Sequence, residues 1–197
     1  ESEAASYYEA WWDKLMPMIW DEMAKDDAVL QRPTTYNTIK LIKERPDLSF
    51  FDIQETTEKE TAKEILQLSF KAGVQDIIDW KKSHPTNSLV EWRTFKDSYI
   101  GHLLRIQPFN IPVKHGGNHD IVNAHSRTHG PSWRMVVSRE KTGIKAWGVY
   151  PGGQSGNPGS YYYNNLLDTW VADKHFQLSF SNAADESNSL YTVSLNP

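Results

Sequence analysis

Residues 133–150 have the sequence WRMVVSREKTGIKAWGVY, and this stretch decides the fold class of the second half of the chain. Two apolar runs flank a short charged segment that contains a glycine, which is typical of a hairpin of two buried strands. We therefore expect Trp133–Val137 and Lys145–Tyr150 to pair as antiparallel strands through a turn at Lys141–Gly143.

The hairpin is followed by a loop rich in glycine, PGGQSGNPGS at residues 151–160. It contains neither GxGxxG nor GxxxxGK[ST], so it lacks the pattern of a phosphate-binding loop. Ser155 does not fit a GxSxG nucleophile elbow either, because Gly156 stands one residue too early. The glycines indicate a loop whose backbone conformation excludes larger residues.

Three consecutive tyrosines, Tyr161–Tyr163, come next. They could stack on a sugar or a peptide, but three neighbours cannot share one face, so we expect at least one to pack inward. Tyr163–Asp173 has a helical pattern, and LYTVSL at residues 190–195 alternates as a final strand does.

The first half of the chain predicts helices. Apolar residues over Ser6–Lys25 recur at three- and four-residue steps, and Pro17 predicts a kink or two short helices that meet near Met16. A short helix is expected between the prolines of Arg32–Pro46.

The longest predicted helix begins at a capping box formed by Thr57 and Glu60 and continues to about Trp80. Gly73 in its middle indicates close packing against another element. A polar break follows, so the chain is helix-rich over residues 1–82 and rich in strands and loops over residues 83–197. Neither half alone shows enough apolar periodicity to close a core, so we predict an α+β chain that forms one domain, or a fragment of a larger one.

Composition excludes several classes of protein. The chain of 197 residues carries a formal charge of −4, with eight Trp, nine Tyr and no Cys. There is no basic field for nucleic acid and no apolar run of the ~20 residues needed to span a bilayer. Without cysteine there is no disulfide, thiolate nucleophile or Cys-based zinc site. No cofactor is indicated.

Four histidines have the i, i+4 spacing of helical metal ligands: His115 with His119, and His125 with His129. Glycines lie between the first pair, and Gly130 and Pro131 follow the second, so neither segment is expected to be helical. No HExxH pattern is present, and no run of alternating Asp and Asn indicates calcium. We expect loop histidines and no metal site.

Two strings are specific, HGPSWRMVV at residues 129–137 and PGGQSGNP at residues 151–158, and a helix with the core LLDTW follows them. Together with the helical region that starts at TYNTIKLIKERP, they resemble the C-terminal part of the large subunit of the penicillin acylase family. The resemblance covers essentially the whole chain. It implies a portion of an N-terminal nucleophile hydrolase αββα sandwich, from a periplasmic or secreted precursor that cleaves itself into two subunits.

The resemblance also implies the chemistry. The family hydrolyses linear amides of N-acyl compounds, such as β-lactam side chains or acyl-homoserine lactones, with a serine whose freed α-amino group is the base. This sequence starts at Glu1, and the motif around the family's nucleophile is not found at Ser2. The oxyanion asparagine also belongs to an earlier part of the large subunit. No catalytic, substrate-binding or metal-binding residue is therefore transferred, and the chain alone is expected to be inactive.

The expected partner is the remainder of the precursor, with Arg134 and the loop at 151–158 supporting the core or lining one wall of the cleft. Without that partner, we expect an exposed apolar surface near Trp133 and Trp147. The alternative is a non-catalytic binding module on the same scaffold, whose loop and tyrosines hold a peptide or a sugar.

Overall fold

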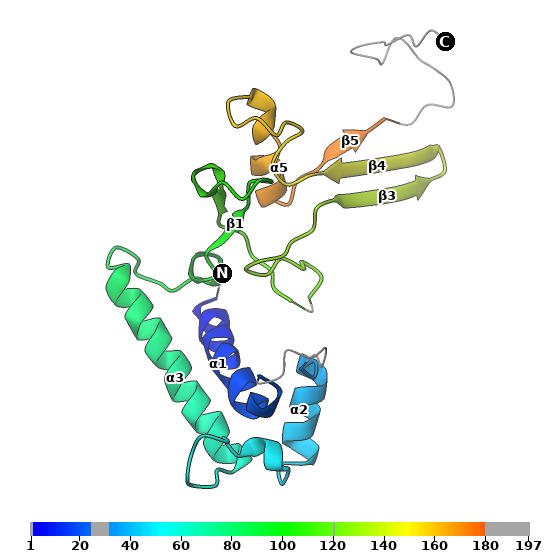
Figure 1. The fold of residues 1–197 in the computed structure, drawn as a ribbon. Coiled ribbons are helices and arrows are strands. Elements are labelled where there is room, and N and C mark those ends of the chain that lie inside the picture. Colours follow the sequence, from blue (N-terminus) through cyan, green and yellow to red (C-terminus); the bar gives the residue numbers. More distant parts are fainter. Residues whose placement is uncertain (1, 25–31, 120, 180–197) are drawn as a thin grey trace. The chain divides into compact units, whose positions relative to one another are not determined.

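The computed structural model describes residues 2–24, 32–119 and 121–179 (Figure 1). The chain divides into two compact units, Glu1–Lys96 and Asp97–Pro197. Helices dominate the first unit, and short antiparallel strands and loops dominate the second, so the predicted α+β class is confirmed. That the whole chain forms one domain stays a prediction.

The first unit is built on two packed helices, α1 (Glu3–Ile19) and α3 (Ala62–Ser83). Gly73 lets them approach closely, because a Cβ there would lie 2.6 Å from the backbone nitrogen of Trp11. Its predicted role in close packing is confirmed. The unit also contains α2 (Thr35–Glu44), α4 (Trp92–Phe95) and 3₁₀ turns at Asp21–Ala24 and Ser49–Phe51.

Two apolar clusters form the core of this unit. The larger one joins the C-terminal part of α1 to the start of α3, and the smaller one joins α1, α3 and the segment before α4. Their buried members are Leu15, Ile19, Trp20, Phe51, Ala62 and Ile65 in the first cluster, and Ala10, Ile77 and Val90 in the second.

Two predictions for these helices need revision. α1 is one continuous helix through Pro17, so the alternative of two short helices that meet near Met16 is wrong, and the alternative of a kink stays a prediction. Pro17 lies in the last turn of α1, where it removes a single backbone hydrogen bond. The capping box lies at Thr61 and Glu64, four residues after the predicted one, and α3 extends to Ser83. The short helix predicted between Arg32 and Pro46 is confirmed as α2.

The second unit contains two small antiparallel sheets. One pairs β1 (Ser98–Ile100) with β2 (Ile111–Val113), and the other has the order β3-β4-β5. The strands of the second sheet are β3 (Arg134–Glu140), β4 (Gly143–Val149) and β5 (Phe176–Leu178). The short helix α5 (Leu167–Val171) and 3₁₀ turns at Gln107–Phe109 and Tyr161–Tyr163 complete the unit, whose core is Val113, Val149, Leu167 and Trp170.

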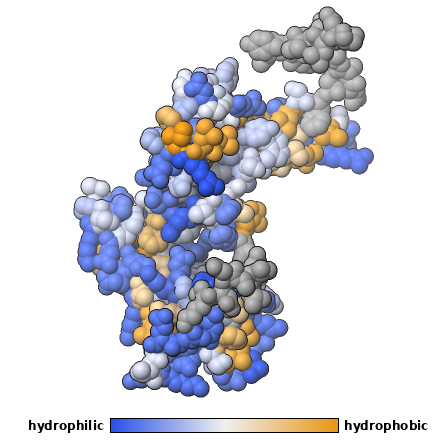
Figure 2. Space-filling view, in the orientation of Figure 1, coloured by the Kyte–Doolittle hydropathy of each residue, from blue (hydrophilic) through white to orange (hydrophobic). Residues whose placement is uncertain are grey.

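The predicted hairpin is confirmed. β3 and β4 pair from Arg134↔Val149 to Glu140↔Gly143, which leaves Lys141 and Thr142 as a two-residue turn. The prediction that both strands are buried is wrong for β3, where Met135, Val136 and Val137 are each about half exposed, at 53%, 52% and 52%. Apolar residues lie on the surface of this hairpin in Figure 2.

The helix predicted at Tyr163–Asp173 is shorter, because a 3₁₀ turn replaces its beginning and α5 starts at Leu167. Tyr161 and Tyr162 are exposed, whereas Tyr163 is half-buried and its hydroxyl donates to the Phe109 carbonyl at 2.8 Å, so one tyrosine packs inward as expected. The strand predicted at residues 190–195 lies outside the described residues. None of the helices in the described part of the chain is both long and apolar enough to cross a bilayer.

Candidate functional site

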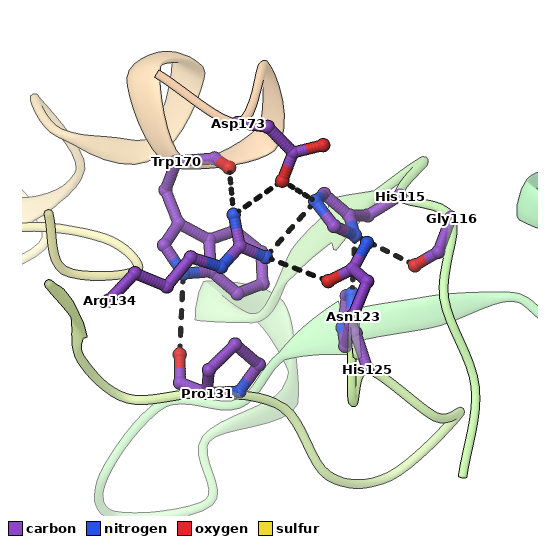
Figure 3. A network of polar contacts seen from close by, with 8 residues as sticks. All are labelled: His115, Gly116, Asn123, His125, Pro131, Arg134, Trp170 and Asp173. Carbon is purple, nitrogen blue, oxygen red and sulfur yellow. Dashed lines mark hydrogen bonds and ion pairs between the residues drawn. The ribbon is translucent and has the colours of Figure 1, made fainter. Parts of the chain in front are cut away.

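The second unit contains a cluster of polar side chains centred on Arg134, the first residue of β3 (Figure 3). The guanidinium Nη1 donates to the Trp170 carbonyl and to Asp173 Oδ1, each at 2.8 Å. Nη2 contacts His115 Nε2 at 3.2 Å and Asn123 Oδ1 at 3.4 Å. Arg134 therefore joins the loop before β3, the strand itself and the end of α5.

The contacts of His115 determine which of its nitrogens carries a proton. Nδ1 lies 2.8 Å from the Gly116 carbonyl, which can only accept, so Nδ1 is the donor. Nε2 lies 3.2 Å from Nη2 of Arg134, which can only donate, and 3.2 Å from Oδ1 of the Asp173 carboxylate, which can only accept. His125 Nδ1 lies 2.9 Å from the same Nδ1–H and is therefore an acceptor. This assignment leaves the remaining proton of a neutral His125 on Nε2.

Asp173 occupies an unusual backbone conformation. Its φ of 56° lies in the left-handed region, where glycine is preferred at the end of a helix. The Asp173 N–H bonds the Trp170 carbonyl at 3.2 Å, and the Lys174 N–H bonds the Thr169 carbonyl at 2.9 Å, which together form a Schellman motif. This motif directs the carboxylate of Asp173 to Arg134 and to His115 Nε2, 3.2 Å away.

Trp170 forms the apolar side of the cluster. Its ring is buried, its Nε1 donates to the Pro131 carbonyl at 3.3 Å, and the Arg134 guanidinium carbon lies 4.5 Å from the ring centroid. The rings of His115 and His125 each lie 5.0 Å from it. Burial lowers the pKa of Arg134, and the nearby Asp173 carboxylate opposes that shift. A guanidinium nevertheless stays charged, so the cluster is a charged bridge over an aromatic surface.

The histidine pairs are not arranged as the i, i+4 spacing suggested. One histidine of each pair, His115 and His125, is buried and in mutual contact, while His119 and His129 are exposed. Neither segment is helical, as expected. Among the described residues, no group of three His, Cys, Asp or Glu side chains is placed to hold a metal ion.

The loop at residues 151–160 is held by its own hydrogen bonds. Ser155 Oγ accepts from the Asn157 N–H at 3.1 Å, and Asn157 Oδ1 accepts from the Gly159 N–H at 2.9 Å. Gly152 has a φ of 90°, and at Gly153 a Cβ would collide with the Tyr162 carbonyl. Ser155 thus caps a turn and is not the serine of a strand-to-helix elbow.

Sequence reasoning selected Arg134 but missed its partners. Asp173 lies 39 residues away from Arg134 and 58 from His115, so no local spacing connects them. The signal in the sequence was an arginine directly before the apolar run of a predicted strand, because a cation placed against a core requires anionic or carbonyl partners. The partners described for His115 are a carbonyl, a guanidinium, a carboxylate and an imidazole, none of which is a hydroxyl or thiol nucleophile. The cluster is thus suited to positioning rather than to bond cleavage.

Helices dominate the first unit and small antiparallel sheets the second, so the chain is an α+β protein. Comparison with family models identifies the family: the model described as penicillin amidase matches residues 1–187. The chain belongs to the penicillin amidase family, whose members are amidohydrolases. A search of curated proteins found no match.

Proposed function

We propose that this chain is the C-terminal part of the large subunit of a penicillin-acylase-type enzyme that hydrolyses linear amides of N-acyl compounds. The acyl group is that of a β-lactam side chain or an acyl-homoserine lactone. The nucleophilic serine and the oxyanion-stabilising groups belong to the rest of the precursor, which is the partner of this chain. The complete protein acts in the periplasm or outside the cell, in keeping with the resemblance.

The observation that carries this proposal is the exposure of the apolar residues of β3. Three consecutive apolar residues, Met135–Val137, are half exposed, and consecutive strand residues point to opposite faces of a sheet. Among the described residues, β3 pairs only with β4, and none of them pairs with its other edge. A strand that is apolar on both faces and open at one edge is typical of an interior strand of a larger, covered sheet. A self-contained binding module would be expected to protect such an edge.

The proposal is tested by coexpressing the chain with the upstream part of its precursor and measuring hydrolysis of a chromogenic phenylacetyl anilide. We expect turnover from the combination and none from the chain alone. Val136→Lys should abolish both association and turnover, because it places a charge in the covered sheet. Tyr36→Lys on α2, where the native side chain is 74% exposed, is the matched control and should retain both.

Two results would contradict the proposal. The first is turnover by the chain alone that serine-directed inhibitors abolish. The second is a stable, monomeric chain that does not associate with the upstream part, which would favour a self-contained binding module.

A further inference from the structure

The second unit contains a cavity of about 170 Å³ beside the Arg134 cluster, with which it shares Trp170 and His125. Its apolar walls include Tyr99, Trp170 and Pro131, and its polar wall includes His125, Arg127 and His129. At the ~0.74 packing density of protein interiors, a ligand of roughly 125 Å³ would fill it. This is smaller than the ~300–1,000 Å³ of sites for drug-sized ligands, so the space suits a small molecule with one flat apolar group.

His125 gives this cavity a defined hydrogen-bonding character. His125 is 5% exposed. Because the Gly116 carbonyl requires His115 Nδ1 to be the donor, we assign His125 Nδ1, 2.9 Å away, as an acceptor, and the proton of a neutral His125 to Nε2. The Cδ2–Nε2 edge faces Gly130, another residue of the cavity wall, where a Cβ would lie 2.7 Å from Cδ2 and 3.3 Å from Nε2. An N–H group can donate to two acceptors at once, so a ligand oxygen can bind here even when Nε2 also has a partner within the protein.

The chemistry of the walls selects the ligand. Among the described residues that line the cavity none is acidic, whereas one arginine and two histidines are present. The Trp170 ring is fixed by its hydrogen bond to the Pro131 carbonyl, and Tyr99 supplies a second aromatic surface. We propose that this cavity binds a small carboxylate that carries a flat apolar group, with the carboxylate at the His125 side and the apolar group between Tyr99 and Trp170.

The test is a titration of the full 197-residue chain with benzoate and with benzyl alcohol, a neutral analogue of similar size, followed by NMR shifts of the tryptophan indole N–H groups. Benzoate should bind saturably with a Kd on the order of 1 mM, shift the Trp170 indole, and bind at least about fivefold more tightly than benzyl alcohol. Equal binding of the two probes, or no saturable binding of benzoate, would overturn the proposal.

Variants locate the site. Tyr99→Ala should weaken benzoate binding about fivefold and leave the fold intact, because Tyr99 is 56% exposed. Tyr161→Ala, 76% exposed and outside the cavity, is the matched control and should bind as the native chain does. Gly130→Ala should weaken binding by placing a methyl group against His125. Equal affinity of the Tyr99 and Tyr161 variants would place the binding elsewhere and overturn the proposal. No amide hydrolysis is measured, so the outcome is independent of the proposed function.

Discussion

The two units of this chain achieve stability by different means. In the first, α1 and α3 satisfy their own backbone hydrogen bonds, so apolar side chains fill the space between them. In the second, strands are short and loops are long, and the buried centre contains the charged cluster of Arg134 and His115. The last carbonyl groups of a helix have no partner within the helix, and Arg134 adds a side-chain donor to the Trp170 carbonyl at the end of α5. In the second unit, side chains thus supply some of the backbone hydrogen bonds that helix geometry supplies in the first.

This difference between the two units predicts which single substitutions lower the unfolding free energy most. The largest effect is expected at Trp170. Trp170→Ala removes a buried ring that contacts Arg134, His115 and His125, and we expect it to lower the unfolding free energy by about 3–5 kcal/mol. Urea denaturation followed by circular dichroism measures the change. Trp133→Ala is the matched control, since its side chain is 38% exposed, and it should cost clearly less. Equal costs would mean that the cluster does not organise the unit.

The next largest effect is expected in the first unit, at the contact between α1 and α3. Gly73→Ala places a methyl group against the backbone of Ala10 and Trp11, which cannot move aside as a flexible side chain does. The helix propensity gain of about 1 kcal/mol should be outweighed by overpacking, with a net cost of about 1–2 kcal/mol. Gly156→Ala, where the added Cβ would meet no atom within 4 Å, is the control in the same denaturation experiment. A stabilised Gly73 variant would show that the helices can separate freely.

Sequence patterns predicted the features that depend on residues close together in the chain. The hairpin, α2 and the close approach at Gly73 followed from turn residues, proline boundaries and one glycine inside a helical face. The start of α3 was predicted four residues early because two T-x-x-E strings follow one another directly, at residues 57–60 and 61–64. Only the second is directly followed by the buried face that begins at Ala62 and Ile65.

Other features depend on residues that are distant in the sequence or outside it. The exposure of β3 was expected from the family resemblance alone, which implies a missing covering partner; the apolar pattern by itself does not show it, because an apolar strand has the same pattern whether its covering partner is present or not. The Arg134 cluster joins Asn123, His115 and Asp173, and Asp173 reaches it through a left-handed residue that helix-end statistics assign to glycine. For the candidate site, the sequence therefore pointed to Arg134 but did not predict which residues contact it.

A smaller effect is expected at the cap of α3. Thr61→Ala removes the Oγ that accepts from the Glu64 N–H and donates to the Glu64 carboxylate, and it should cost about 1 kcal/mol. Thr57→Ala, at the position that the sequence pattern favoured, should change stability by less than about 0.5 kcal/mol. Amide hydrogen exchange in the first turn of α3 should rise in the Thr61 variant alone. The opposite ranking would move the start of the helix back to Thr57.

The smallest effect is a pH dependence that originates in the first unit. Burial raises the pKa of Glu22, and Asp21 and Asp52 add to that shift, while Asp21 Oδ1 and Glu22 Oε2 accept no hydrogen bond from the described residues. The folded chain therefore holds this proton more tightly than the unfolded chain. Its contribution to stability is complete below the unfolded pKa and is lost as pH rises through the folded pKa.

Glu22→Gln removes this titration, so the native chain should lose stability relative to the variant as pH rises from about 4 through the raised pKa of Glu22. Urea midpoints of both chains across that interval measure the difference. Glu58→Gln, at an exposed glutamate of the same unit, should follow the native curve. Parallel curves for the native and Glu22→Gln chains would show that the carboxyl of Glu22 is as well solvated in the folded chain as in the unfolded one.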